Sequence, residues 1–184
     1  DGNDHARVDL VIGNTREVAS AVQRLEVDIG LIEGPCHEPG LDVAAWREDE
    51  LVIVFGDRHR QAAALRAGAD MAQLRGACWL LREPGSGTRE AAEQALLPHL
   101  HGFSEVLQLG GTEAIKQGAV AGLGLACLSR HAVADLVALG RLHELSTPLP
   151  PLRRQLWLVR HPGKRVAASL RRLLALDEGT FADA

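Results

Sequence analysis

The sequence predicts an α/β protein in which buried strands alternate with amphipathic helices. Short apolar runs are separated by segments whose apolar residues recur at helical spacing, from one end of the chain to the other. This alternation is typical of a sheet with parallel strands and with helices packed on its faces. Most of the runs are apolar without a break, so we expect the strands to be covered on both faces.

The apolar runs give the expected strands in chain order. These strands are residues 8–12, 29–32, 51–55, 78–81, 106–109, 123–128 and 156–159. Residues 58–69 are rich in alanine and charge and predict a loop with a short helix. The proline-rich residues 147–151 predict an extended connector.

The segments between these runs predict helices that each turn an apolar stripe toward a sheet. The stripes are Val18, Val22 and Leu25; Ala91, Ala95 and Leu96; Ile115, Ala119 and Leu123; Val133, Leu136 and Val137; and Val166, Leu170, Leu173 and Leu174.

Length and composition are those of an ordinary globular protein. The chain has 184 residues, 46% of them hydrophobic and 24% charged, which suffices for one large domain or two small ones. No apolar run is long enough to span a membrane, and the polar residues 1–5 do not resemble a signal peptide. The formal net charge of -4 argues against nucleic-acid binding by this segment alone. We therefore expect a cytoplasmic protein without a membrane partner.

The three cysteines are odd in number and widely spaced, which favours free thiols in a reducing compartment. Cys78 and Cys127 lie in apolar runs and are expected to fill the core. Cys36 follows Gly34-Pro35 in an expected loop, where an inert thiol and a redox sensor both remain open.

Small polar residues occupy three expected junctions between a strand and a helix. The junctions are residues 13–17, 82–90 and 110–116. The free backbone N–H groups of a helix start attract anions. In the first junction Asn14 and Glu17 have the spacing of a capping box, and in the second two glycines allow close approach to a ligand. The residues alone leave two interpretations open, ordinary helix caps or an anion site.

Other chemistry has little support in these residues. Residues 84–88 lack the spacing of a phosphate-binding P-loop, and Ser86 lies in Gly-Ser-Gly rather than in a nucleophile elbow. His99 and His101, two residues apart, do not match a metal-binding helix. We therefore expect no enzymatic activity, no cofactor and no metal.

Four segments in order resemble a known family. They are residues 5–15 (HARVDLVIGNT), 28–35 (DIGLIEGP), 82–89 (REPGSGTR) and 112–129 (TEAIKQGAVAGLGLACLS). They are similar to motifs of the effector-binding domain of LysR-type transcriptional regulators, especially the branch of the cysteine-metabolism and carbon-fixation regulators. The resemblance spans nearly the whole chain.

The resemblance implies a two-lobed fold like that of the type II periplasmic binding proteins, with two crossover connections. Lobe I would be residues 1–52 and 152–184, and lobe II would be residues 53–151. The family's first strand and helix of lobe I precede the HARV segment, so we expect them to be absent from this chain. Effectors of the family bind between the lobes, which here implies Asn14, Thr15, Glu33, Gly34, Pro35, Ser86, Gly87, Thr88, Gly111 and Thr112 as effector-binding residues.

The function implied is a sensor of a small anionic effector whose binding closes the lobes and alters the geometry of a homodimer or homotetramer. DNA would be contacted only by a separate amino-terminal winged helix-turn-helix. Glu33 departs from this pattern, because its carboxylate opposes an anionic ligand unless Arg16, Arg82 or Arg89 neutralises it. The alternative expectation is an extracytoplasmic solute-binding protein of the same fold.

Overall fold

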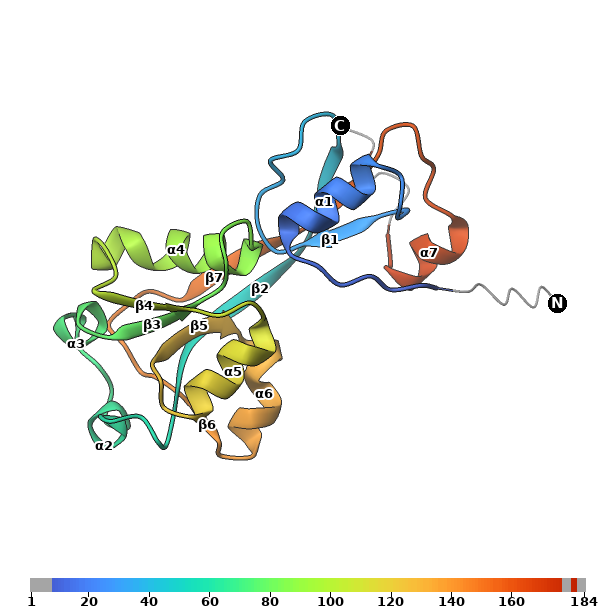
Figure 1. Ribbon diagram of the computed structural model, residues 1–184. Coiled ribbons are helices and arrows are strands. Elements are labelled where there is room, and N and C mark those ends of the chain that lie inside the picture. Colours follow the sequence, from blue (N-terminus) through green and yellow to red (C-terminus); the bar gives the residue numbers. More distant parts are fainter. Residues whose placement is uncertain (1–7, 177–179, 182–184) are drawn as a thin grey trace. The chain divides into compact units, whose positions relative to one another are not determined.

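The computed structural model describes residues 8–176 and 180–181. The helices are α1 (Thr15–Gln23), α2 (Ala62–Leu65), α3 (Met71–Arg75), α4 (Gly87–Leu100), α5 (Thr112–Val120), α6 (Arg130–Ala138) and α7 (Ala168–Leu173). The strands are β1 (Gly30–Ile32), β2 (Asp42–Gly56), β3 (Cys78–Leu81), β4 (Glu105–Gln108), β5 (Leu125–Ser129), β6 (Leu142–Glu144) and β7 (Leu152–Arg160), as Figure 1 shows.

The chain forms two compact units. The central unit is Glu48–Arg154, and the terminal unit joins the described residues up to Arg47 to those from Gln155 onward. Strands β2 and β7 each pass from one unit into the other. The two units are therefore connected by two strands rather than by a loop.

The sheet of the central unit mixes parallel and antiparallel strands. β3 pairs in parallel with β4 and with β5, whereas β5 and β6 both pair with β2 in the antiparallel direction. The expectation of a parallel sheet is therefore wrong for β2 and β6. An apolar run cannot reveal strand direction, because a central strand is buried on both faces in either arrangement.

The central unit has a hydrophobic core on each face of its sheet. Successive side chains of β2 alternate between the cores, since side chains of a strand point to opposite faces. Ile53 and Phe55 join a core with residues of α4, and Val52 and Val54 join a core with Ile115 of α5 and residues of α6. In Figure 1, α4 accordingly covers one face, and α5 and α6 cover the other.

The terminal unit has a smaller core. β1 pairs antiparallel with β7, placing Gly30 opposite Val159, and α1 packs on β1. A Cβ atom on Gly30 would lie 2.7 Å from side-chain atoms of both Val18 and Val159. Glycine is therefore required for the close approach of α1 to this strand pair.

Several expected elements differ in the structure at their ends. The expected strand 51–55 is only the buried end of β2, which begins at Asp42, and residues 42–48 of this strand are half-buried or exposed. Leu25 and Leu123 lie beyond the helices they were expected to join. β6 and α3 were not expected, because each is too short for a periodic pattern.

Two expectations in the terminal unit are wrong. Residues 8–12 form no strand, and their apolar side chains are exposed, from 59% at Val8 to 87% at Ile12. The helix α7 forms, but none of its residues is fully buried and Leu173 is 62% exposed, whereas an apolar stripe packed on a sheet would be buried. Periodicity reports which side chains could be buried, whereas burial requires a packing partner in space.

A buried ion pair lies where the two connecting strands leave the central unit. Arg154 Nε of β7 donates to Asp49 Oδ2 of β2 at 2.8 Å, and Ser129 Oγ at the end of β5 donates to Asp49 Oδ1 at 2.9 Å. The side chains of Arg154 and Asp49 are only 7% and 4% exposed. The Asp49 carboxylate thus links three strands. Loss of the Arg154 guanidinium would leave this carboxylate buried without a counter-charge or water.

Replacing Arg154 by Met is expected to lower the free energy of unfolding by about 3–5 kcal/mol, because Asp49 would stay buried without its cation. Urea denaturation of the chain measures this loss. The matched control is Arg153→Met, which removes an ion pair to Glu48 whose side chains are 67% and 70% exposed, and should cost about 0–1 kcal/mol. Equal losses in the two variants would contradict the structural importance of the buried pair.

Candidate functional site

The start of α4 places two hydroxyl side chains in a buried position. Ser86 and Thr88 are only 1% and 4% exposed. Gly85 turns the chain with a φ of 90°, in the left-handed region that favours glycine. Ser86 is the N-cap, but its side chain makes no capping hydrogen bond. The interpretation as an ordinary side-chain cap therefore does not hold at Ser86.

The start of α5 lies beside that of α4. β3 and β4 are parallel neighbours, so the helices that follow them begin at the same edge of the sheet. The N-cap of α5 is Gly111, which offers no side chain to the first turn. A Cβ atom on Gly111 would meet no atom within 4 Å, so packing within the described chain does not require glycine there.

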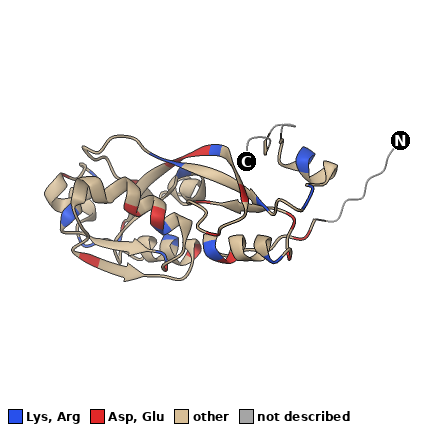
Figure 2. Cartoon of the chain, turned by 90° about the horizontal axis from the view of Figure 1, so that it is seen from above, with Lys and Arg blue, Asp and Glu red and all other residues tan. Residues whose placement is uncertain are grey.

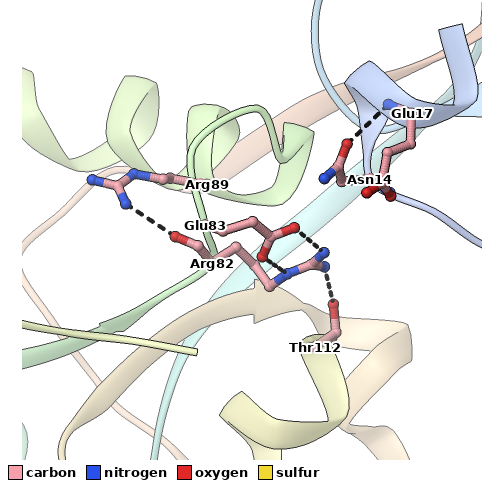
Figure 3. A network of polar contacts seen from close by, with 6 residues as sticks. All are labelled: Asn14, Glu17, Arg82, Glu83, Arg89 and Thr112. Carbon is pink, nitrogen blue, oxygen red and sulfur yellow. Dashed lines mark hydrogen bonds and ion pairs between the residues drawn. The ribbon is translucent and has the colours of Figure 1, made fainter. Parts of the chain in front are cut away.

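Arg82 connects the loop that precedes α4 to the start of α5, as Figure 3 shows. It follows β3 directly, and its NH1 atom donates to Thr112 Oγ1 of α5 at 3.1 Å. Its Nε and NH2 atoms donate to the two carboxylate oxygens of Glu83, each at 2.8 Å. The side chains of Arg82 and Glu83 are only 13% and 23% exposed, so this is a largely buried bidentate ion pair.

Arg89 supports the same loop from the first turns of α4. Its NH1 atom donates to the carbonyl oxygen of Arg82 at 3.0 Å, and its Nε atom donates to Glu93 at 2.8 Å. Glu93 is four residues further along the helix, where opposite charges attract. The backbone of Arg82 is thus fixed by Arg89, while the guanidinium of Arg82 is fixed by Glu83 and Thr112 (Figure 3).

The expected residues of the terminal unit begin α1 and follow β1. Asn14 is the N-cap of α1, and its Oδ1 atom accepts from the backbone N–H of Glu17 at 2.9 Å, while the backbone N–H of Asn14 donates to Glu17 Oε2 at 2.9 Å. The predicted capping box is confirmed. Thr15 is 9% exposed at the start of the helix. Glu33, Gly34 and Pro35 come immediately after β1.

The structure therefore brings together the expected residues of the central unit, at one edge of its sheet. These are Ser86, Gly87, Thr88, Gly111 and Thr112. The sequence-based set did not include Arg82 and Glu83. A charged pair directly after a buried strand and before Pro84 was the available signal, but nothing in the sequence indicated that the two side chains bind each other.

The thiols have the environments of packed side chains. Burial raises the pKa of Cys127 to about 12, and burial together with the nearby Glu105 carboxylate raises the pKa of Cys78. Cys36 is half-buried and its Sγ atom lies 3.8 Å from the carbonyl oxygen of Glu38. Among residues 8–176 and 180–181, no three His, Cys, Asp or Glu side chains are grouped to hold a metal ion.

In the folded chain at pH 8, iodoacetamide is expected to alkylate Cys36 much faster than Cys127. At a pKa of about 12, only about one Cys127 thiol in ten thousand is a thiolate at this pH, and the thiolate is the nucleophile. Mass spectrometry of tryptic peptides against time measures the order. Urea-unfolded protein serves as the control, in which all three cysteines should react alike. Equal rates in the folded chain would show that the core opens at Cys127.

The family model of the LysR substrate binding domain matches residues 3–178. The chain belongs to this family. The match confirms the resemblance seen in the four sequence segments, and the mixed α/β structure has the family's fold of type II periplasmic-binding-protein kind. The domain is therefore the effector-binding domain of a LysR-type regulator.

Relatives of known sequence agree with this assignment. The chain is 43% identical over 167 residues to the uncharacterized HTH-type transcriptional regulator YeiE of Escherichia coli K12, covering 91% of this chain and 56% of YeiE. It is 35% identical over 123 residues to the regulator CysL of Bacillus subtilis, covering 67% of this chain and 40% of CysL. The chain thus spans about half the length of these relatives, which are named transcriptional regulators rather than solute-binding proteins.

A solved structure is also similar. The regulatory domain of CcmR from Synechocystis PCC6803, in complex with 2-PG, matches with a TM-score of 0.75 and 27% identity, covering 92% of this chain and 80% of that one. Within the part of the chain that the structure describes, no helix has the length and apolar character needed to cross a membrane.

Proposed function

We propose that this domain senses a small anionic effector for a cytoplasmic transcriptional regulator and has no enzymatic activity of its own. The observation that carries the proposal is that Arg82, in the loop that leads into α4, is hydrogen-bonded to Thr112 at the start of α5, at the end of the parallel strands β3 and β4. Each helix start supplies backbone N–H groups without intrahelical partners, together with the positive end of the helix dipole. Two helix dipoles and a guanidinium directed at one region favour negative charge there.

The effector would contact the hydroxyl and glycine residues at these two helix starts. In the central unit these are Ser86, Gly87, Thr88, Gly111 and Thr112, and Asn14, Thr15, Glu33, Gly34 and Pro35 would be the contacts in the terminal unit. The complex of CcmR with 2-PG supports a small-molecule effector for a relative of this chain.

Effector binding would act by changing how the two units are held by β2 and β7. A ligand shifts such an equilibrium only through a difference in its affinity for the two states. We propose that the units act as lobes that close on the effector, and that closure alters the geometry of a homodimer or homotetramer. The relatives' names support a regulatory role at DNA.

DNA would be bound by a separate amino-terminal domain. Lys and Arg residues are dispersed among Asp and Glu along the described chain (Figure 2), and the formal net charge is -4. Phosphate binding needs a concentrated basic surface. This distribution supports a role in sensing rather than in DNA contact.

A non-enzymatic role is supported by the chemistry of the best nucleophile candidates. Ser86 lies in a Gly-Ser-Gly sequence rather than in a nucleophile elbow. The elevated pKa values of Cys78 and Cys127 make both thiols poor nucleophiles. The backbone N–H groups at the helix starts are donors, and the hydroxyl groups of Ser86, Thr88 and Thr112 can also donate, which suits binding of an anion without further chemistry.

Replacing Thr88 or Thr112 by Val is expected to weaken binding of anionic ligands about tenfold, because a hydrogen bond to a charged group is lost at unchanged side-chain shape. Isothermal titration calorimetry with 2-PG and with inorganic phosphate measures the affinity. Thr147→Val is the matched control, since Thr147 lies in the connector after β6, and its affinity should equal that of the unmodified chain. Unchanged affinity in both variants would exclude these helix starts as the site.

Saturation with 2-PG is expected to reduce the radius of gyration of the chain, because a ligand held by both units favours their closed arrangement. Small-angle X-ray scattering with and without the ligand measures the change. Thr112→Val at the same ligand concentration should show a smaller change. Calorimetric saturation without any change in the radius would contradict closure while leaving the binding site intact.

A further inference from the structure

We propose that Glu83 is a built-in competitor of the effector. Its carboxylate is bound to the guanidinium of Arg82, and an anionic effector must displace it to reach Arg82. This inference rests on the proposed function, and it names the chemical class of effector and the residue that sets the affinity threshold.

The contact between Arg82 and Glu83 has the geometry of a bound oxyanion. Both carboxylate oxygens of Glu83 accept from Arg82, each at 2.8 Å, one from Nε and one from NH2. This fork-to-fork arrangement is the one in which arginine recognises carboxylate and phosphate groups. An effector with two oxygens on one centre would therefore make the same two hydrogen bonds in place of Glu83.

The pair is also unusual in its sequence separation. Arg82 and Glu83 are adjacent residues between the end of β3 and the turn at Gly85. Side chains of neighbouring residues in extended backbone point to opposite sides. Here both side chains turn toward each other, so the pairing depends on the specific path of this loop (Figure 3).

Arg82 also contacts both neighbouring helices. Its NH1 atom donates to Thr112 of α5, and its carbonyl oxygen accepts from Arg89 of α4. The side chain of Glu83 is 23% exposed, against 13% for Arg82. These two contacts do not involve Glu83, so they would hold Arg82 in place when an anion takes the position of the Glu83 carboxylate.

The competition selects among ligands by their chemistry. A neutral molecule cannot replace the charge of Glu83, and a monatomic anion such as chloride cannot accept both parallel hydrogen bonds. The effector is therefore an oxyanion, with a carboxylate, sulfate or phosphate group directed at Arg82. Glu83 also keeps this region neutral in the absence of effector, which avoids a buried unpaired guanidinium.

The test is calorimetric titration with sodium sulfate, whose charge is constant near neutral pH. Glu83→Gln removes the competing charge at nearly the same shape and is expected to bind sulfate at least about tenfold more tightly than the unmodified chain. Glu113→Gln is the matched control, because Glu113 lies in the first turn of α5 but its side chain is 70% exposed and pairs with Lys116. Its affinity should change by less than about twofold.

A second variant separates the effect of the lost charge from an effect of misfolding. Glu83→Asp keeps the charge, but its carboxylate is one methylene shorter and should compete less well for Arg82, giving an intermediate affinity for sulfate. Thermal unfolding of each variant confirms that it is folded. An affinity of Glu83→Gln equal to that of the unmodified chain, or lower, would overturn the proposal, and a lower value would show that Glu83 instead orients Arg82 for anion binding.

The outcomes also separate this proposal from the proposed function. If sulfate binds the unmodified chain and Thr112→Val weakens it, but Glu83→Gln does not strengthen it, the anion site stands and the competitor is excluded. If no variant binds sulfate, including Glu83→Gln, the competitor is excluded as well, because removal of Glu83 should expose Arg82 to any oxyanion.

Discussion

The parallel pairing of β3 with β4 is the constraint on which the candidate site depends. It places the loops after Leu81 and Gln108 at one edge of the sheet, so that α4 and α5 begin side by side. The guanidinium of Arg82 then spans the short distance to Thr112. With the two strands antiparallel, one of these helix starts would lie at the opposite edge and the dipoles would not act on one region.

Electrostatic balance at this edge follows from that convergence. Two positive helix ends and Arg82 create a region that needs negative charge, and Glu83 supplies it within the chain. The charge of Asp49 is likewise balanced within the chain, by Arg154 of β7 and by the hydroxyl group of Ser129 in β5. The side chains of Asp49 and Arg154 are almost fully buried. The pair at Arg82 is more exposed, which makes exchange with a dissolved anion physically reasonable.

Elements that depend on local sequence were predicted correctly, whereas elements that depend on a partner distant in the sequence were not. Residues 78–81 were confirmed as β3, because four consecutive apolar residues have few alternatives to a buried strand. The capping box at Asn14 was confirmed because it needs only local contacts. Residues 8–12 are also mostly apolar but form no strand, since a strand exists only where a neighbour pairs with its backbone.

The sequence by itself determined the α/β class, the family, and the polar residues at the helix starts, because these depend on local periodicity, capping chemistry and motif order. Tertiary structure alone decided that β2 runs antiparallel to β5, that α7 buries no side chain, and that Arg82 binds both Glu83 and Thr112. The reason is that strand direction and ion pairing depend on the path of the backbone between elements, whereas side-chain periodicity reports only which face of an element is apolar.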